Sequence, residues 1–269
     1  MKIYLVTYGD NGFYLSKKHL EYLAINSGLF DRVISLGPKD LDSKFKKKYK
    51  KILHQPKGGG FWLWKFEIIK TLLSQINEND IVIYCDAGAS LNTSKIAINR
   101  FNEYIEILSN PNTSQLKMKC ENHFIEKNYT NKKLFEYFDI DLDSDFANST
   151  QLQAGHQFYK KCNETTSYFN DYEELIDSDV NLITDFYSKE TQIDSFSEHR
   201  HDQSIFSLLS KKYSAYVIEN ETEFKNRPDK QYGFPFLSVR SYGHGTKDYL
   251  NYFLNRRKFL QKAKFFADN

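Results

Sequence analysis

The sequence predicts an α/β protein built on a doubly wound, mainly parallel sheet. One reason is the order of its first predicted elements, a strand, a helix and a second strand within the first 36 residues, which is how such sheets begin. The other is the stretch Ile81–Ala89 (IVIYCDAGA). Its apolar start is long enough for one strand buried on both faces, and it ends in Asp86 followed by three small residues. Open α/β sheets bind ligands at the carboxyl ends of their strands.

Taken alone, Asp86 is explained at least as well by a turn in which its carboxylate bonds to the backbone as by a ligand site. The composition fits either interpretation. A chain of 269 residues with 40% apolar and 16% aromatic residues forms one large domain, with or without an appendage. The net charge of +2 is too small to indicate nucleic acid as a partner.

The cysteines and the apolar runs bear on the compartment. Cys85, Cys120 and Cys162 lack the spacing of a metal or redox motif, which suits a reducing compartment. The apolar run at the N-terminus is too short for the core of a signal peptide, and no window approaches the length of a membrane span. The sequence therefore predicts a cytoplasmic protein.

The first strand is predicted over residues 2–7, and a turn-rich segment follows it. The next helix closes at Gly28. Its predicted apolar side consists of Leu15, His19, Tyr22, Leu23 and Ile25. Arg32–Leu36 is the second strand, and the lysine-rich run 44–51 is interpreted as a solvated helix face. A doubly wound sheet brings Thr7 and Tyr8 to the same edge as Asp86.

A glycine-rich stretch, Lys57–Lys65 (KGGGFWLWK), leads into a helix predicted to carry both Trp62 and Trp64 in its first turn. Glycines before a helix let backbone amides approach an anion at the positive end of the helix dipole. A lysine so near a helix N-terminus is disfavoured unless an anion is bound there. Lys65 is therefore a candidate phosphate contact, and Trp62 a candidate stacking surface for a sugar or base. A hydrophobic helix start with glycines in a turn is an equally favoured alternative.

The rest of the chain continues the alternation of strands and helices. The predicted elements are helix 94–108, strand 116–120, helix 133–138, strand 151–159, helix 163–176, a helix from about residue 202 to 209 and a final strand 215–219. Small residues at Ala154 and Gly155 let main chain lie against a ligand. The acidic run 139–145 lacks the glycine and the glutamate of a calcium loop, so it is interpreted as a solvated loop.

Polar residues gather around Asp202 in the stretch Glu198–Gln203 (EHRHDQ). Asp202 is a candidate N-cap of the following helix, but capping does not account for its neighbours. His199 and His201 alone are weak evidence for a metal. Residues 246–269 predict a basic amphipathic helix, which either lies on an anionic membrane surface or packs on its own domain. We therefore divide the chain into a domain, 1–245, and this helix.

Four separated stretches thus point to one edge of one sheet, namely 7–8, 58–65, 84–88 and 153–203. In combination they resemble nucleotide-sugar glycosyltransferases of the GT-A fold, above all a group from bacterial surface-polysaccharide clusters and large DNA viruses with a GGG(F/Y)W-x-WK stretch followed by YxDAG. The resemblance covers residues 2 to about 213. Ala154-Gly155 and Asp202-Gln203 more loosely resemble motifs of glycosyltransferase family 8, in which His244 and Lys247 would stand for a late His-x-x-Gly-x-x-Lys, at shorter spacing.

The resemblance implies a Rossmann-like, mainly parallel sheet flanked by helices, and transfer of a hexose from a nucleotide diphosphate, UDP above all, to a hydroxyl of a glycan or other acceptor. The implied nucleotide contacts are Thr7, Tyr8, Lys65, Asp86 and Ala87. The implied sugar and acceptor contacts are Trp62, Trp64, Gly155, His156, Arg200 and Gln203. The implied catalytic residues are Asp202 and His201, with Asp202 acting as base if the enzyme inverts and as transition-state stabiliser if it retains.

The resemblance further implies a divalent cation, Mn²⁺ or Mg²⁺, at Asp86, with His244 as a weaker candidate ligand. Gly88 stands where these enzymes usually carry a second acid, and one carboxylate provides few ligands for such an ion. Lys57, Lys65 and Arg200 offer a metal-free way to neutralise a leaving diphosphate. At the level of sequence both arrangements stay open.

Two other functions fit parts of the same pattern. A nucleotide-sugar or glycan-binding module would keep the pocket without the chemistry, and the missing second acid favours it slightly. A sugar nucleotidyltransferase also uses a glycine-rich loop and an acid at a strand end, but it needs at least two well-placed acids for metal. The glycosyltransferase remains the first hypothesis.

Overall fold

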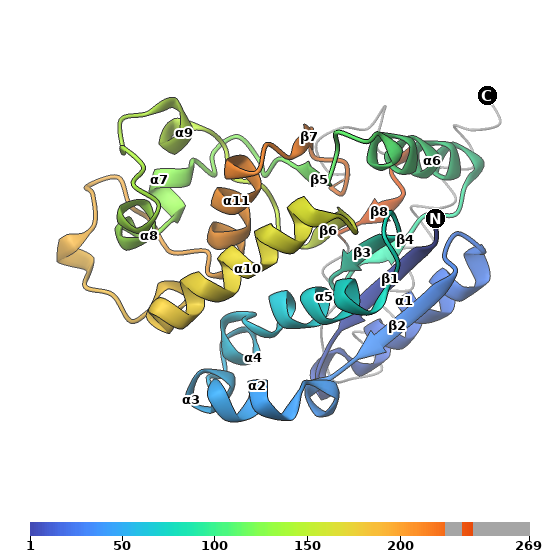
Figure 1. Cartoon of the computed structure of the whole chain (residues 1–269), viewed down its shortest axis with the longest axis horizontal. Coiled ribbons are helices and arrows are strands. Elements are labelled where there is room, and N and C mark those ends of the chain that lie inside the picture. The colour runs from blue at the N-terminus through green and yellow to red at the C-terminus, as the bar shows by residue number, and fades with distance from the viewer. Residues whose placement is uncertain (224–232, 239–269) are drawn as a thin grey trace.

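A computed structural model describes residues 1–223 and 233–238 of the chain. Its centre is a six-stranded sheet with the strand order β2-β1-β3-β6-β5-β7 (Figure 1). The strands are β1 (Ile3–Tyr8), β2 (Arg32–Leu36), β3 (Ile81–Cys85), β5 (Gln115–Met118), β6 (His156–Lys160) and β7 (Tyr216–Ile218). Among these six, β6 alone runs against the others. The predicted α/β class with a mixed, mainly parallel sheet is confirmed.

Helices flank this sheet on both faces. The longer ones are α1 (Tyr14–Ser27), α5 (Trp64–Gln75), α6 (Lys95–Ser109), α10 (Asn163–Ser178) and α11 (Asp202–Lys212). One apolar core joins α5, α10 and α11 to the sheet, and a second joins α1 and α6 to it (Figure 1). Because consecutive side chains of a strand point to opposite faces, Tyr84 of β3 belongs to the first core and Ile83 to the second. This is why the whole run of β3 is apolar.

Short elements connect the long ones. They are η1 (Asn11–Phe13), η2 (Pro38–Asp40), α2 (Ser43–Lys48), α3 (Lys50–Leu53), α4 (Gly58–Phe61), α7 (Glu126–Tyr129), α8 (Lys132–Tyr137), α9 (Asp145–Asn148), η3 (Val180–Ile183) and η4 (Lys189–Thr191). A separate antiparallel pair joins β4 (Ser90–Leu91) to β8 (Phe236–Leu237). Strand 215–219 was predicted to be the final strand, but β8 follows it. A strand of two residues is too short to show a period in the sequence, which is why β8 was missed.

The structure corrects three further details of the sequence analysis. Leu15, Tyr22 and Ile25 of α1 are 37%, 63% and 60% exposed. His19 and Leu23 are buried as predicted, together with Ser16, Leu20 and Ala24. β6 begins at His156, so Ala154 and Gly155 precede the strand rather than interrupt it. The N-cap of α11 is His201, and Asp202 is already its first helical residue.

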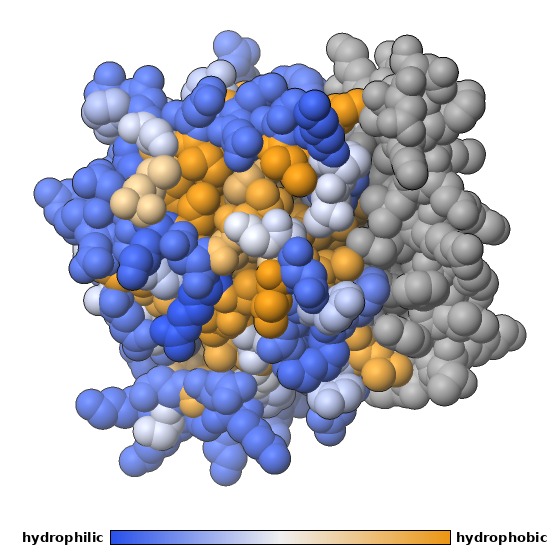
Figure 2. Space-filling model, turned by 90° about the vertical axis from the view of Figure 1, so that its right-hand side faces the viewer, coloured by the Kyte–Doolittle hydropathy of each residue, from blue (hydrophilic) through white to orange (hydrophobic). Residues whose placement is uncertain are grey.

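Apolar residues also reach the surface. Figure 2 shows one face of the molecule on which they gather in a central patch surrounded by hydrophilic residues. None of the described helices combines the length and the apolar composition needed to cross a membrane. The predicted basic helix 246–269 lies outside the described residues.

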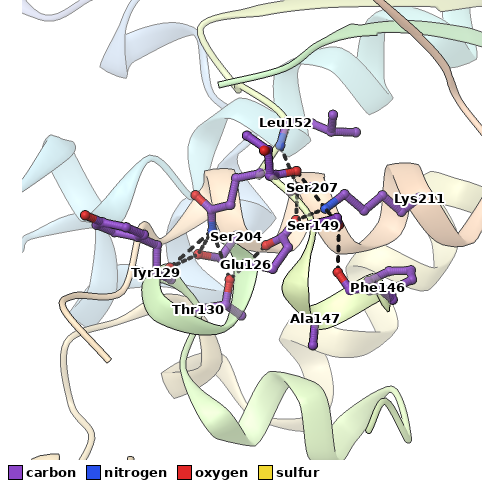
Figure 3. A network of polar contacts seen from close by, with 12 residues as sticks. Glu126, Tyr129, Thr130, Phe146, Ala147, Ser149, Leu152, Ser204, Ser207 and Lys211 are labelled. Atoms are coloured by element: carbon purple, nitrogen blue, oxygen red, sulfur yellow. Dashed lines mark hydrogen bonds and ion pairs between the residues drawn. The ribbon is translucent and has the colours of Figure 1, made fainter. Parts of the chain in front are cut away.

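A buried polar network fixes α11 in its place (Figure 3). Its centre is Glu126 of α7, which is fully buried and accepts hydrogen bonds from Ser207 and Lys211 of α11, the latter at 2.8 Å. Lys211 also donates to Ser149 Oγ at 2.7 Å, and the amide of Leu152 donates to Ser207 Oγ at 2.8 Å. A buried pair held this way is costly to break from one side. The network therefore ties the middle and the last turn of α11 to the segment that leads into β6.

Candidate active site

Three of the four predicted stretches meet at the side chain of Lys65, in the first turn of α5. Its Nζ lies 2.6 Å from Oδ2 of Asp202 at the start of α11. It lies 3.5 Å from Oδ1 of Asp86, directly after β3. It also donates to the carbonyl oxygen of Ala154, just before β6, at 3.1 Å. We call Lys65, Asp86 and Asp202 the charged cluster.

Asp86 is held by one hydrogen bond of its backbone and one of its side chain. Its amide donates to the carbonyl of Gly155 at 2.9 Å, and the hydroxyl of Tyr84 donates to its Oδ1 at 2.5 Å. A Cβ atom on Gly155 would lie 3.1 Å from Oδ2 of Asp86, closer than ordinary van der Waals contact. The missing side chain at Gly155 therefore leaves room for the carboxylate.

Burial separates the roles of the two acids. Asp202 is 4% exposed, and burial raises its pKa to about 6, against the opposing effect of Lys65. The side chain of Asp86 is 46% exposed, so it is the part of the charged cluster that meets solvent. Lys65 is 2% exposed. Burial alone would lower its pKa, but Asp202 and then Asp86 outweigh that effect, and the pKa is raised.

The fourth predicted stretch, Thr7 and Tyr8 at the end of β1, lies against Trp64, the residue before Lys65 in α5. The ring of Tyr8 stacks on that of Trp64, with centroids 3.9 Å apart and planes at 18°. Trp64 Nε1 donates to the carbonyl of Gly58 at 3.0 Å. Thr7 and Ala87 are buried, and the Thr7 hydroxyl has no hydrogen-bond partner among the described residues. The strand ends β1 and β3 and the start of α5 thus form one continuous edge.

The glycine-rich stretch is a left-handed turn, not the first turn of the helix. Residues 58 to 62 all have positive φ, from 55° to 98°, and the amides of Phe61 and Trp62 donate to the carbonyls four residues earlier. The helix α5 begins only at Trp64, so the prediction that its first turn carries both tryptophans is wrong for Trp62. The amides of Gly59 and Gly60 donate to Pro56 and Lys57. These two amides are therefore not free to bind an anion, and the prediction that they do so is wrong.

His201 lies at the centre of an aromatic cluster beside the charged one. Its backbone has φ 54° and ψ −121°, and its ring stacks on Phe61 with centroids 5.2 Å apart, while Trp62 lies 5.6 Å away. His201 Nε2 lies 2.9 Å from Oδ1 of Asp185, whose Oδ2 accepts from Lys57 at 2.9 Å. Burial lowers the pKa of His201, although Asp185 opposes the effect. Strained non-glycine backbone that faces other strained backbone is typical of functional sites.

The remaining predicted residues have partners of their own. His156 is buried in β6, where burial lowers its pKa to about 4. Gln203 donates to Oε1 of Gln151 at 2.8 Å. Arg200 pairs with Glu198 at 3.0 Å and lies over the ring of Phe124, so the structure records no contact between it and the charged cluster. His244 lies outside the described residues.

Sequence reasoning missed two groups of this site. One is the hydroxyl of Tyr84, a side chain interpreted only as part of a strand, although its position two residues before Asp86 was a usable signal. The other is Asp185, which bonds to His201 from a loop more than a dozen residues earlier. Nothing in the local pattern around Asp185 distinguishes it from the other acids of the chain.

The described residues do not by themselves supply a full set of ligands for a divalent cation. They contain no group of three or more His, Cys, Asp or Glu side chains that could hold a metal. The two carboxylates that do converge, Asp86 and Asp202, meet on the ammonium of Lys65. Mn²⁺ and Mg²⁺ prefer several oxygen ligands at about 2.1 Å, and a cation is already present at this point.

No protein-family profile and no curated protein sequence matches this chain. Solved structures resemble it. A glycosyltransferase involved in the glycosylation of the major capsid of PBCV-1 has a TM-score of 0.51 at 9% sequence identity, over 94% of this chain and 100% of that one. Mouse xyloside xylosyltransferase 1 has a TM-score of 0.45 at 11% identity, over 91% and 98%. The galactosyltransferase LgtC has a TM-score of 0.41 at 12% sequence identity, over 81% of this chain and 73% of that one. The first likeness shows that the chain has the GT-A fold expected from the sequence.

Proposed function

We propose that this protein is a glycosyltransferase that moves a hexose from a nucleotide diphosphate sugar, with UDP as the expected nucleotide, to a hydroxyl group of a glycan or similar acceptor. The observation that carries the proposal is the charged cluster. A fold of this class gathers Lys65, Asp86 and Asp202 at the carboxyl edge of β3, where open sheets bind nucleotides.

The donor lies along the edge formed by β1, β3 and α5. Thr7, Tyr8 and Ala87 contact the base and ribose, and the exposed carboxylate of Asp86 accepts hydrogen bonds from ribose hydroxyls. Lys65 supplies positive charge behind the diphosphate as it leaves. The stacked pair of Tyr8 and Trp64 makes this edge rigid, which lowers the cost of ordering on binding.

The sugar and the acceptor lie on the side of Asp202 and His201. We assign the sugar and acceptor contacts, as the resemblance implies, to Trp62, Trp64, Gly155, His156, Arg200 and Gln203. In an inverting reaction the acceptor oxygen attacks the anomeric carbon, the bond from that carbon to the phosphate oxygen breaks, and the acceptor proton passes to Asp202. A base with a pKa of about 6 is mostly ionised at neutral pH and still basic enough to assist. In a retaining reaction Asp202 instead stabilises the positive charge that develops on the sugar.

The alternative is a binding module for nucleotide sugars or glycans. It is favoured by the ion pair that holds Asp202 to Lys65 in a nearly closed space, because a base must reach its substrate. A nucleotidyltransferase is a less favoured alternative, since it needs at least two acids placed for metal, whereas Asp86 and Asp202 both pair with Lys65.

The test is a panel of UDP, GDP, CMP and dTDP sugars, each with and without Mn²⁺, measured by thermal shift and by release of free nucleotide. A ligand present at about 100 times its Kd stabilises the fold by roughly 2.7 kcal/mol. We expect one nucleotide type to raise the melting temperature, Asp86→Ala to abolish the shift, and the exposed loop variant Asp143→Ala to keep it. Slow nucleotide release supports the transferase. Binding without release supports the module. Release of pyrophosphate, after a nucleoside triphosphate and a sugar 1-phosphate have been added, supports the nucleotidyltransferase. No shift with any nucleotide contradicts the proposed site.

A further inference from the structure

We propose that Lys65 is a built-in counter-cation, which occupies the position between Asp86 and Asp202 that a divalent metal ion would otherwise take. The protein then has no metal site of its own there, and it binds its donor without added metal. Binding of the donor without added metal rests on the proposed function, whereas the role of Lys65 between the two acids does not.

The close contacts of the ammonium carry this inference. Nζ of Lys65 forms ion pairs with Asp202 Oδ2 at 2.6 Å and with Asp86 Oδ1 at 3.5 Å, and it donates a hydrogen bond to the Ala154 carbonyl at 3.1 Å. The side chain is 2% exposed and cannot swing into solvent. An ion placed between the two carboxylates would have to displace an ammonium that has nowhere else to go, and an unpaired buried charge is costly.

The open side of Asp86 does not provide a second place for the ion. Oδ1 of Asp86 already accepts from Tyr84, which leaves Oδ2 as the oxygen available to a ligand. A divalent ion there would lie within a few ångströms of the Lys65 ammonium, in a partly buried site where like charges repel strongly. The same carboxylate can accept hydrogen bonds from neutral hydroxyl groups without this penalty.

The balance of charges predicts a gain of function. Two carboxylates and one ammonium give the cluster a net charge of −1, and replacing Lys65 by methionine, which is of similar length and uncharged, changes it to −2. Asp86 and Asp202 then face each other without a cation between them. We expect Lys65→Met to bind Mn²⁺ at one site per chain, and more tightly than the wild type by a factor of about ten or more, since a positive charge about 4 Å away has been removed.

The experiment titrates Mn²⁺ into the full chain, without nucleotide, and follows free Mn²⁺ by electron paramagnetic resonance. Lys65→Met should show one site, and the double variant Lys65→Met with Asp86→Asn should lose it. The control is Lys212→Met, which releases Asp171 from a surface pair at 2.9 Å and should behave like the wild type. A wild-type site that disappears in Asp86→Asn overturns the proposal, and this measurement needs no variant of Lys65 to fold.

A second measurement separates this inference from the proposed function. The thermal shift caused by the preferred nucleotide sugar is compared in EDTA and in Mn²⁺. An equal shift in both supports the counter-cation, and a shift that EDTA abolishes overturns it while leaving the glycosyltransferase intact. If no nucleotide sugar shifts the melting temperature under either condition, the proposed function fails, and the Mn²⁺ titration alone decides the role of Lys65.

Discussion

Lys65 shows how burial changes the meaning of a residue. In the sequence it stands near a helix N-terminus after three glycines, a context that indicates a phosphate contact. In the structure its ammonium forms ion pairs with Asp202 and Asp86 and donates to a backbone carbonyl. Its positive charge therefore acts on the two acids first, and through them on a ligand. No local pattern could reveal this, because Asp202 follows Lys65 by more than half the length of the described chain.

The first prediction concerns the pH dependence of activity. Burial raises the pKa of Asp202 to about 6, so the carboxylate becomes protonated as the pH falls below that value. If the ionised form is needed, kcat/KM should fall about tenfold per pH unit below pH 6 and level off above it. The rate of nucleotide release between pH 5 and 8 measures this profile.

Asp202→Asn is the matched variant, and it should lose turnover at every pH while circular dichroism shows an unchanged fold. A wild-type rate that stays constant from pH 5 to 8 would contradict the role of Asp202. Full activity in Asp202→Asn would remove Asp202 from the mechanism.

At the scale of elements, the left-handed turn at residues 58–62 positions the aromatic cluster. Left-handed backbone costs about 1–2 kcal/mol for each residue other than glycine, and both Phe61 and Trp62 are in this conformation. The three glycines before them lower that cost. The sequence shows that something unusual occurs here, but glycine permits either hand, so the hand of the turn could not be predicted.

The second prediction separates backbone conformation from packing within this turn. Gly60 has φ 98°, and a Cβ atom there would lie 2.7 Å from Cα of Leu53. Gly59 has φ 57°, and the nearest atom to its Cβ would be 3.7 Å away. We expect Gly59→Ala to cost about 1 kcal/mol of unfolding free energy from backbone strain alone, and Gly60→Ala to cost more than about 3 kcal/mol because the clash is with main chain.

The control for this pair is Gly28→Ala at the end of α1, where φ is 67° and a Cβ atom would meet nothing within 4 Å. It should match Gly59→Ala in urea denaturation. Equal losses for Gly59→Ala and Gly60→Ala would show that packing against Leu53 does not constrain the turn.

The elements that the sequence predicted well are those with a clear apolar pattern. β3 is buried along its whole length, and its five apolar residues have no alternative interpretation in a sheet between two layers of helices. The prediction for the buried side of α1 was right for His19 and Leu23 and wrong for Leu15, Tyr22 and Ile25. The reason is that apolar residues are spread around this helix. Sequence thus locates an element more reliably than it assigns the face that packs.

At the scale of the whole molecule, the site depends on long-range placement. The strand-end acid Asp86 and the gap at Gly155 were predictable, since each follows from the residues beside it. One edge was predicted for the stretches that hold Lys65 and Asp202, but their direct ion pair was not. The pair requires α11 to lie against α5, a position that the buried Glu126–Lys211 network helps to fix. The same burial that assembles the site also places two neutral histidines in the interior.

Those histidines link the stability of the whole fold to pH. Burial lowers the pKa of His199 to about 3 and that of His156 to about 4. His199 Nδ1 accepts from the amide of Asn131 at 3.2 Å, and its Nε2 lies 2.9 Å from the carbonyl of Leu182. One nitrogen accepts and the other donates, which is possible only for the neutral ring. A second proton would turn the acceptor into a donor facing another donor.

The third prediction follows from this linkage. An unfolded histidine takes up a proton below about pH 6.5, whereas His199 and His156 stay neutral down to about pH 3 and 4. Between these values the unfolded state binds more protons than the folded state. The free energy of unfolding must therefore fall as the pH decreases from about 6.5. At pH 5 each histidine lowers the free energy of unfolding by about 2 kcal/mol relative to neutral pH. Asp202, whose pKa is shifted in the opposite direction, raises it by about 1 kcal/mol. The histidines outweigh the acid. Urea denaturation at pH 5 and pH 7 should therefore differ by roughly 3 kcal/mol. His199→Gln, which can keep one acceptor and one donor, should reduce this difference by about 2 kcal/mol. The exposed control variant His123→Gln should leave it unchanged. An unaltered difference in His199→Gln would show that His199 is not the source of the acid sensitivity.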